Sequence, residues 1–357
     1  MSQDDLRALG AARTDRRRFA RLLAMAALAG RAGPAAAEEA TSRRTFSNPP
    51  GSPRSGGATG DWLAFFWRHF TGGLPAPDLP AGHVRPEPQA LADVAALGAA
   101  DGVTWLGHAS FLIQLGGRRI LTDPYLTAFA SPVPPLGPKR FAPPGMRPDR
   151  LPPIDVLLLS HNHYDHLDLA SLRRLPLRGR TTVVVPLGVE RYLDGLGFGA
   201  IRCLDWHERL DLGGLAVTCL PAIHFSKRTL GDRNATLWCG FALEAGGRRV
   251  YFAGDTAYGP VFDELGPRYG PFDLGLVPIG AYEPRRLMVG SHATPEEAVA
   301  LGRTLGCRRL MAMHWGTIRL TDEPPFEPPA RFRAAGRSAG LATEALVVPA
   351  IGETIPL

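Results

Sequence analysis

The stretch 156-VLLLSHNHYDHLD-168 places three histidines and two aspartates directly after an apolar run. The apolar residues 156–159 have the length and composition of a buried strand. The loop that follows this strand carries His161, His163, Asp165 and His166. Burial of three imidazoles and a carboxylate without partners would be costly, so the H-x-H-x-D-H spacing predicts a metal site.

Three more candidate ligands end later apolar runs in the same manner. His224 follows VTCLPAI, Asp255 lies in YFAGDT, and His314 follows LMAM. Strands of one sheet end at a common edge, so we expect these side chains to join the histidine-rich loop. Zn²⁺ accepts imidazole nitrogen and carboxylate oxygen, and seven such groups exceed one tetrahedral shell but suit two metal ions. The sequence therefore predicts a dinuclear centre.

Apolar runs separated by glycine-rich turns predict an α/β protein in which helices cover layered sheets. Glycine pairs at 116–117 and 246–247 predict two hairpins, the first between VTWLGHASFLIQL and RRILTDPYL. Helices are expected at 168–175, 188–196 and 294–305. The dense pattern begins near Val103, so we expect a catalytic domain over 101–357 and an N-terminal arm over 38–100. The four cysteines include no C-x-x-C pair and leave any pairing open.

Residues 1–37 have the organisation of an export signal. Arg16 to Phe19 match the twin-arginine pattern R-R-x-F, and the apolar stretch LLAMAALAG and the small residues Ala35 to Ala37 follow. The apolar core of about nine residues is too short to span a bilayer. We therefore expect a periplasmic or otherwise exported protein, with membrane association as an option. The alternative is a basic tail on a cytoplasmic protein.

The charge distribution does not favour a nucleic-acid partner. The formal net charge is +6, but residues 1–37 hold seven arginines and three aspartates, so they account for +4 of it. The remaining chain is nearly balanced, and a polyanion partner is not predicted.

The segment 61–70 concentrates aromatic residues after an aspartate that could cap a helix. Five of its ten residues are aromatic: Trp62, Phe65, Phe66, Trp67 and Phe70. Two interpretations remain open, because the rings either pack on the main domain or form a peripheral contact with a membrane surface.

Several blocks of sequence resemble one known family. They are VTWLGHASFLIQ, LTDPYL, GPKRF, LPPIDVLLLSHNHYDHLD, HFSKRTLGD, LW, FAGDTAYGPVFDELGPRYGPFDLGLVPIGAYEPR, TPEEAV and MHWGT. The H-x-H-x-D-H motif with its later histidines and aspartate resembles the metallo-β-lactamase fold superfamily. Within it, the blocks resemble the N-acylphosphatidylethanolamine-hydrolysing phospholipases D, from about Thr45 to Leu346.

This resemblance implies an αββα sandwich with two zinc ions per chain. His161, His163 and His224 would bind one ion, Asp165, His166 and His314 the other, and Asp255 would bridge them. Asp123 would steady the histidine loop, and His108 would lie behind the ligands or in the core. His292 falls at a substrate-facing position, although its neighbours in Ser291-His292-Ala293 depart from the family pattern. Asp165 and His292 are the expected catalytic residues, with Tyr164 and His292 contacting the substrate.

The implied reaction is hydrolysis of a phospholipid diester to N-acylethanolamine and phosphatidic acid. Zinc lowers the pKa of bound water, which makes a nucleophile available at neutral pH. The alternatives are a lactonase, a β-lactam hydrolase or another hydrolase on the same scaffold, a metal-binding protein without activity, and a nucleic-acid hydrolase. The oligomeric state stays open, a homodimer included.

Overall fold

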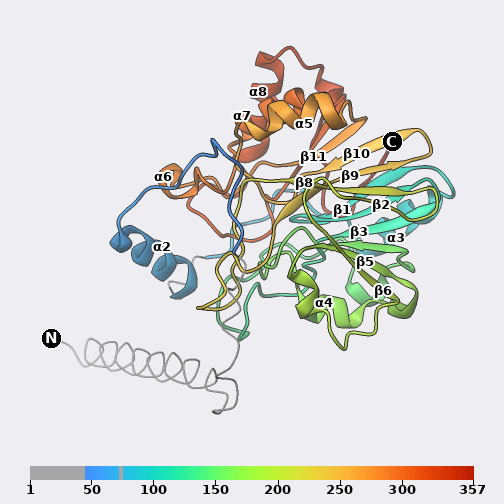
Figure 1. Ribbon diagram of the computed structural model, residues 1–357, viewed down its shortest axis with the longest axis horizontal. Helices are drawn as coiled ribbons and strands as arrows, with labels where there is room; N and C mark the ends of the chain where they lie inside the picture. The colour runs from blue at the N-terminus through green and yellow to red at the C-terminus, as the bar shows by residue number, and fades with distance from the viewer. Residues whose placement is uncertain (1–44, 72–74) are drawn as a thin grey trace. The chain divides into compact units, whose positions relative to one another are not determined.

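The computed structural model describes residues 45–71 and 75–357, and residues 45–357 belong to one compact unit. The export signal predicted over 1–37 lies outside the described residues, as does the beginning of the predicted arm over 38–100. The described residues form two seven-stranded sheets packed face to face, with helices on their outer faces (Figure 1). The predicted αββα sandwich is thereby confirmed.

The first sheet contains the histidine-rich segment. Its strands are β1 (Gly102–Gly107), β2 (Ser110–Leu115), β3 (Arg118–Thr122), β4 (Val156–Leu158), β5 (Thr182–Pro186), β6 (Ala200–Leu204) and β14 (Thr354–Pro356). Their order across the sheet is β14-β1-β2-β3-β4-β5-β6. Strands β3 to β6 run parallel, whereas β1, β2 and β14 pair antiparallel.

The second sheet is formed by the C-terminal half of the chain. Its strands are β7 (Arg209–Asp211), β8 (Ala216–Pro221), β9 (Cys239–Ala245), β10 (Arg248–Phe252), β11 (Leu274–Pro278), β12 (Arg309–Met313) and β13 (Leu346–Val347). They follow one another across the sheet in chain order. Strands β10 to β13 are parallel, so their carboxyl ends lie at one edge.

Five helices cover the outer faces of the sheets (Figure 1): α3 (Glu87–Ala96), α4 (Leu169–Arg174), α5 (Val261–Tyr269), α7 (Pro295–Thr304) and α8 (Pro328–Ser338). Helices α2 (Thr59–Thr71) and α6 (Arg285–Met288) lie beside the sheets and pack against each other (Figure 1). Helix α7 begins with a capping box between Thr294 and Glu297 and has Pro295 in its first turn, which is why its start was readable from the sequence.

The alternation of side chains along each strand divides the core into two layers. In β2, Phe111 and Ile113 point into the cluster between the two sheets, together with Phe241 and Phe252 of the second sheet. Leu112, between them, joins a separate cluster on the outer face of the first sheet. Both layers are buried, so the strands read as continuous apolar runs rather than as alternating patterns.

Both predicted hairpins are confirmed. The pair Gly116 and Gly117 joins β2 to β3, and Gly246 and Gly247 join β9 to β10. All four glycines have positive φ, as a two-residue hairpin turn of this type requires. The run VTWLGHASFLIQL, however, is not one strand. It folds back at His108, whose φ is 56°, to form the antiparallel pair β1 and β2.

Two of the three expected helices are confirmed as α4 and α7. The stretch 188–196 instead contains only a 3₁₀ turn over Val189–Tyr192. Gly188 and Gly195 flank it with positive φ, a conformation that a right-handed helix cannot contain, so the helix expected over 188–196 is interrupted at both ends. The four cysteines are unpaired. None of the helices in the described part of the chain has the length and hydropathy of a bilayer-spanning segment.

Candidate metal centre

The candidate ligands come from the ends of four strands in both sheets. The histidine-rich loop follows β4 in the first sheet, while His224, Asp255 and His314 follow β8, β10 and β12 in the second. The structure brings all seven predicted ligands together at this common edge.

The first group of ligand atoms consists of three imidazoles and one carboxylate. His161, His163, His224 and Asp255 offer ligand atoms that all lie within 4.8 Å of one another. His163 Nδ1 is 2.8 Å from His161 Nε2 and 3.2 Å from His224 Nε2. Asp255 Oδ2 lies 4.0 Å from His161 Nε2 and 3.7 Å from His224 Nε2. This set matches the first of the two predicted sites.

The second group contains Asp165, His166 and His314, as predicted, and also His108. Asp165 Oδ2 is 3.5 Å from His166 Nε2 and 3.7 Å from His314 Nε2. Asp255 joins the two groups, because its Oδ2 lies 3.1 Å from His166 Nε2 and its Oδ1 lies 3.1 Å from His314 Nε2. Its place between the groups is the one required of a bridging ligand.

Several of these atoms are buried without hydrogen bonds. His166 Nε2, His314 Nε2 and Asp255 Oδ1 have no hydrogen-bond partner among the described residues. The three side chains are at most 3% exposed. Buried polar atoms normally have partners, and converging orphan atoms of imidazole and carboxylate are what a metal ion would satisfy. The residues present therefore fit a metal centre.

Asp123 supports this arrangement from behind. Its Oδ2 accepts hydrogen bonds from His166 Nδ1 at 2.7 Å and from Ser160 Oγ at 2.5 Å, and its Oδ1 accepts from Ser160 N at 2.7 Å. The bond to Nδ1 fixes the ring so that Nε2 faces the centre. This contact agrees with the steadying role predicted for Asp123.

Other ligands are oriented in a similar way. His224 Nδ1 lies 2.8 Å from the carbonyl oxygen of Ser291, to which it donates, so that Nε2 is left for the centre. His161 Nδ1 lies 2.9 Å from Ser160 Oγ. The positions are also specific in backbone conformation, since Asp123 and His314 have positive φ values of 33° and 63°. Such conformations are uncommon for these residue types and cluster at functional sites.

The pKa values of His314 and His166 shift in the opposite direction from those of the histidines in the first group, whereas burial lowers the pKa of His108, also in the second group, to about 3. In the first group, burial lowers the pKa of His163 to about 3 and of His224 to about 4. In the second group, burial alone would lower the pKa of His314, but the carboxylates of Asp255 and Asp165 raise it to about 9.

His166 behaves like His314, and the carboxylates show the reverse effect. Burial opposes the shift, but Asp255, Asp165 and Asp123 hold the pKa of His166 well above its usual value. The pKa values of Asp165 and Asp255 lie well below the usual range, because the histidines outweigh the effect of burial. Every ion pair that these two aspartates form in the described part of the chain is with a histidine. A divalent cation would supply the same positive charge and displace the protons.

His108 contacts a candidate ligand, as one of the two positions expected for it requires. Its Nε2 is 2.9 Å from Asp165 Oδ2, and its ring centroid is 3.9 Å from that of His314. The signal available in the sequence was a histidine after Gly107 between two apolar runs, which predicts a tight turn at a strand end.

The two predicted substrate contacts occupy different surroundings. The His292 ring lies 5.0 Å from that of His224 and 5.4 Å from that of His314, and its Nδ1 is buried without a hydrogen-bond partner in the described residues. Tyr164 lies farther out, where its hydroxyl donates to the carbonyl oxygen of Arg228 at 3.0 Å. Its ring packs with Ile318 and Leu320.

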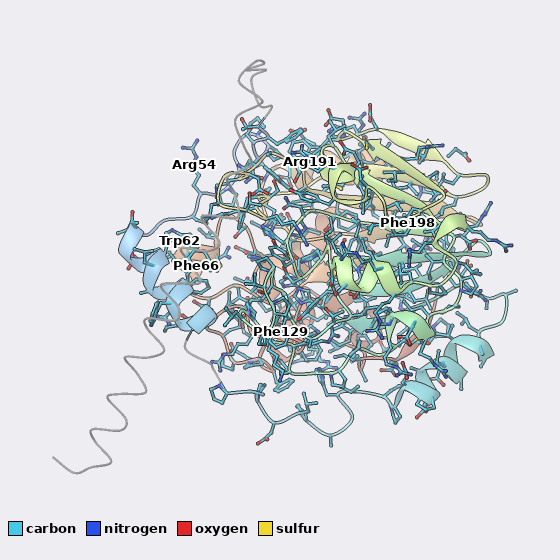
Figure 2. The ribbon with its side chains drawn as sticks, turned by 90° about the horizontal axis from the view of Figure 1, so that it is seen from below. Arg54, Trp62, Phe66, Phe129, Arg191 and Phe198 are labelled. Atoms are coloured by element: carbon cyan, nitrogen blue, oxygen red, sulfur yellow. The ribbon has the colours of Figure 1, made fainter. Side chains whose placement is uncertain are left out.

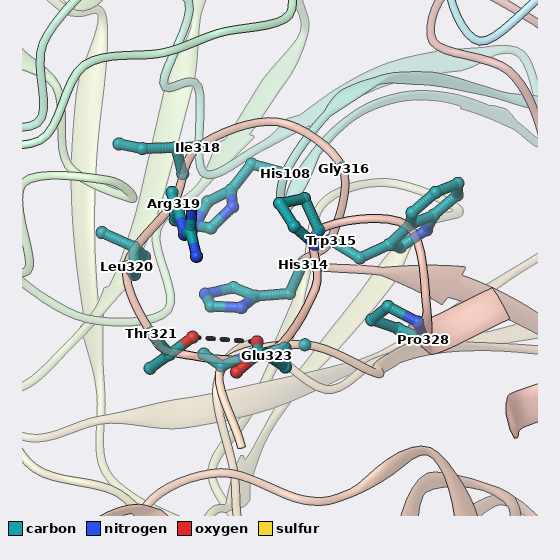
Figure 3. A pocket seen from close by; sticks show the side chains of 13 residues that line it. His108, His314, Trp315, Gly316, Ile318, Arg319, Leu320, Thr321, Glu323 and Pro328 are labelled. Atoms are coloured by element: carbon teal, nitrogen blue, oxygen red, sulfur yellow. Dashed lines mark hydrogen bonds between the residues drawn. The ribbon is translucent and has the colours of Figure 1, made fainter. Parts of the chain in front are cut away.

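A pocket opens beside the second group (Figure 3). Its wall includes His108 and His314 and the loop after β12. This loop contributes Arg319, a residue that sequence reasoning did not single out, because one arginine among many carries no recognisable pattern. Tyr164 does not line this pocket, but its neighbours Ile318 and Leu320 do.

Comparison with known proteins identifies relatives of this chain. The chain is 41% identical to a Mycobacterium tuberculosis protein over 238 residues, which cover 65% of this chain and 63% of that protein. It is 41% identical over 237 residues to the N-acyl-phosphatidylethanolamine-hydrolyzing phospholipase D 1 of Caenorhabditis elegans, covering 63% of this chain and 67% of the relative. The mitochondrial protein of the same description from Saccharomyces cerevisiae is 33% identical over 258 residues, covering 70% of this chain and 55% of the relative.

Solved structures and a family model agree on the fold. An isothiocyanate hydrolase from Delia radicum gut bacteria matches with a TM-score of 0.58 at 22% identity, covering 72% of this chain and 99% of that one. CmlA, a diiron β-hydroxylase from Streptomyces venezuelae, matches with a TM-score of 0.55 at 21% identity, covering 72% of this chain and 54% of that one. The model of the β-lactamase superfamily domain matches residues 118–315, which include every candidate ligand except His108. The chain therefore belongs to the β-lactamase superfamily.

Proposed function

We propose that this chain is a zinc-dependent hydrolase of phospholipase D type, which cleaves N-acylphosphatidylethanolamine-like phospholipids to N-acylethanolamine and phosphatidic acid. The observation that carries the proposal is the pair of adjoining ligand groups that share Asp255. The names of the Caenorhabditis elegans and Saccharomyces cerevisiae relatives support the substrate class. The long blocks of similar sequence favour it over a lactonase or a β-lactam hydrolase.

Each ligand group would hold one of two zinc ions. His161, His163 and His224 would bind the first, and Asp165, His166 and His314 the second, with Asp255 contacting both. When bound, such a pair of ions supplies an activated water and polarises the oxygens of a phosphodiester. The imidazole-rich ligand set suits zinc, but imidazole and carboxylate ligands also bind iron or manganese. Metal analysis of the purified protein is therefore part of the test.

The remaining residues position the ligands and the substrate. Asp123 holds the ring of His166, and the carbonyl oxygen of Ser291 holds the ring of His224. His292 would donate to a phosphoryl or leaving-group oxygen, because its ring faces the ligands and its Nδ1 has no partner among described residues. Its backbone is fixed by Arg285, which donates to the His292 carbonyl oxygen at 2.6 Å and pairs with Glu297 at 2.7 Å.

The test is hydrolysis in ¹⁸O-labelled water with the zinc-loaded protein. The panel contains N-acylphosphatidylethanolamine, phosphatidylethanolamine, a lactone and a β-lactam, and mass spectrometry identifies the broken bond. Attack at phosphorus places ¹⁸O in phosphatidic acid and releases unlabelled N-acylethanolamine. Label in a free fatty acid, or turnover of only the lactone or β-lactam, would overturn the proposal.

A peripheral membrane contact belongs to the same proposal, because the substrate lies in a bilayer. In helix α2, Phe65 is buried and packs with Leu287 and Met288. The opposite part of the helix is exposed: Leu63, Phe66 and Trp67 are 65%, 45% and 54% accessible. Figure 2 shows Phe66 and Trp62 on this helix. One ring of the segment thus packs on the protein, whereas other side chains are exposed. We propose that the exposed part enters the lipid interface.

Replacement of Leu63, Phe66 and Trp67 by serine tests the membrane contact. Each apolar side chain that leaves lipid should cost on the order of 1–3 kcal/mol, so binding to liposomes should weaken more than tenfold. Hydrolysis of a short-chain soluble substrate should stay near the wild-type rate, and the melting temperature should fall only slightly, because Phe66 also contacts the rings of Trp62 and Phe65. Leu177→Ser is a matched control, since Leu177 is 56% exposed outside α2. Equal loss on vesicular and soluble substrates would assign α2 a structural role only.

Export by the twin-arginine route is a separate proposal about location. It rests on the order of charged, apolar and small residues in 1–37. Replacement of Arg16 and Arg17 by lysine should leave the unprocessed protein in the cytoplasm. Unchanged processing and export of this variant would refute the proposal.

A further inference from the structure

Arg319 lies in the loop after β12 and lines the pocket beside His108 and His314 (Figure 3). Its Nε is buried and has no hydrogen-bond partner among the described residues. None of the ion pairs formed within residues 45–71 and 75–357 includes this guanidinium. A buried N–H group without an acceptor is costly, so the position calls for an acceptor from outside the chain.

The acidic residues of the same loop are already engaged elsewhere. Asp322 pairs with Arg68 at 2.7 Å and with His69 at 3.4 Å, both from helix α2. Glu323 accepts hydrogen bonds from the backbone N–H of Ala281 at 2.6 Å and from Thr321 Oγ1 at 2.8 Å. Both carboxylates of the loop are therefore engaged by other partners, and neither forms an ion pair with Arg319.

The rest of the pocket wall includes one carboxylate, that of Glu323, and both of its oxygens accept hydrogen bonds from other groups. The side chains of Ile318, Leu320 and Trp315 are apolar, apart from the indole N–H, which is a donor. The two imidazoles, His108 and His314, belong to the second ligand group. A ligand in this pocket would thus meet a cation that has no ion-pair partner in the described residues, directly beside the candidate metal centre.

We propose that Arg319 binds an anionic phosphoryl oxygen of the substrate and so selects charged phosphodiesters over neutral esters and lactones. The guanidinium presents a planar set of donors that matches phosphate oxygens, and such charge-assisted hydrogen bonds are stronger than neutral ones. The inference rests on the proposed function, since it places the phosphoryl group of that substrate between Arg319 and the side of the centre formed by His314.

The test measures binding as well as turnover. Isothermal titration of the zinc-loaded protein with dihexanoyl phosphatidate gives the affinity for the anionic product. In Arg319→Met this affinity should fall roughly 10- to 100-fold, which corresponds to the loss of hydrogen bonds to a charged group. Arg319→Lys should give an intermediate affinity, because the charge remains but the fork of donors is lost. Arg333→Met is the matched control, since Arg333 is exposed on α8 and does not line the pocket.

Two further ligands show whether Arg319 recognises the phosphoryl group or the acyl chains. Dihexanoylglycerol has the same chains without the phosphate, and its binding should not change in Arg319→Met. Inorganic phosphate should lose affinity by a factor similar to that of dihexanoyl phosphatidate if Arg319 recognises the phosphoryl group alone. Equal affinity of wild type and Arg319→Met for both anions, with zinc content and melting temperature unchanged, would overturn the inference.

The role of Arg319 and the proposed function can each fail without the other. A wild-type protein that cleaves N-acylphosphatidylethanolamine, with unchanged kcat/KM in Arg319→Met, would remove the role of Arg319 and leave the function standing. A wild-type protein that leaves the lipid intact but binds dihexanoyl phosphatidate through Arg319 would remove the function and leave the anion site standing.

Discussion

The two ligand groups on either side of Asp255 are built from different chemistry. The first group combines Asp255 with three imidazoles, from His161, His163 and His224. The second combines imidazoles with a carboxylate of its own, Asp165. Burial lowers the pKa of His224 to about 4 in the first group, whereas the two carboxylates raise the pKa of His314 to about 9 in the second.

This difference makes the two ligand groups unequal as candidate metal positions. A buried neutral imidazole already has its lone pair available to a metal, so the first group needs little rearrangement of protons. In the second group, the carboxylates hold positive charge on His166 and His314, which a metal must displace. Asp255 lies within 3.1 Å of both of these rings and within 4.0 Å of the first group. It is the one side chain whose loss should affect both positions.

The largest effect is therefore expected from Asp255→Asn. The amide keeps the size of the side chain but removes the charge shared by the two groups. Zinc content should fall at both positions, and kcat/KM should fall on the order of 10³-fold or more, since a direct ligand should exceed the 10- to 100-fold typical of supporting partners. Metal analysis by mass spectrometry, the circular dichroism spectrum and the rate of lipid hydrolysis measure this. Full zinc content with full activity would contradict the bridging role.

The next prediction separates the two positions. His224→Gln should remove the zinc ion of the first group, and Asp165→Asn should remove that of the second, so each variant should keep about one ion per chain. The remaining ion is identified by adding a second substitution to His224→Gln: Asp165→Asn should release that ion, whereas His163→Gln, in the group already emptied, should not. If either single substitution empties both positions, the two groups bind metal as one cooperative unit. Their different pKa values then do not make them separate metal positions.

Much of this centre could be predicted from the sequence, because its ligands stand at strand ends. The apolar runs before His161, His224 and His314 identify the strands. A common edge of one sheet accounts only for His224, Asp255 and His314, because the histidine-rich loop joins them from the other sheet. The spacing of the ligands did not show which of them belong to the same metal position; that assignment came from the family resemblance. The sequence left two places open for His108, and the contact of its Nε2 with Asp165 Oδ2 places it behind that ligand.

The pocket beyond the ligands was not predictable in the same way. Arg319 acquires its significance from Asp322 and Glu323 being engaged by Arg68 and by the backbone of Ala281. These contacts join segments more than 40 residues apart, and no local pattern records them. For the same reason, the sequence left the aromatic segment 61–70 open, whereas packing with Leu287 distinguishes the buried Phe65 from the exposed Trp67.

Asp123→Asn should affect the second group more than the first. Asp123 Oδ2 fixes His166 directly through Nδ1 at 2.7 Å, but it reaches His161 of the first group only through Ser160 Oγ. Loss of such a supporting partner typically costs 10- to 100-fold in metal affinity or activity. Zinc titration should show much weaker binding of one ion and a smaller change for the other. Because Asp123 also holds Ser160, a melting curve is needed beside the titration, and equal weakening of both ions would assign Asp123 to the whole loop.

The smallest effect is expected at His108, and it decides whether the second group has three ligands of its own or four. Its Nε2 lies 2.9 Å from Asp165 Oδ2, and a carboxylate only accepts, so this nitrogen carries the proton and is not available to a metal. His108 then acts by positioning Asp165.

His108→Gln can keep a donor to that carboxylate and should retain zinc and most activity. His108→Leu leaves a buried carboxylate oxygen without its donor, which should cost about 1–3 kcal/mol, or roughly 10- to 100-fold in affinity for one ion. The comparison of glutamine with leucine, by zinc titration and kcat/KM, separates positioning from coordination. If the glutamine variant loses the ion as completely as Asp165→Asn does, His108 is itself a ligand. The second group then has four ligands of its own rather than three.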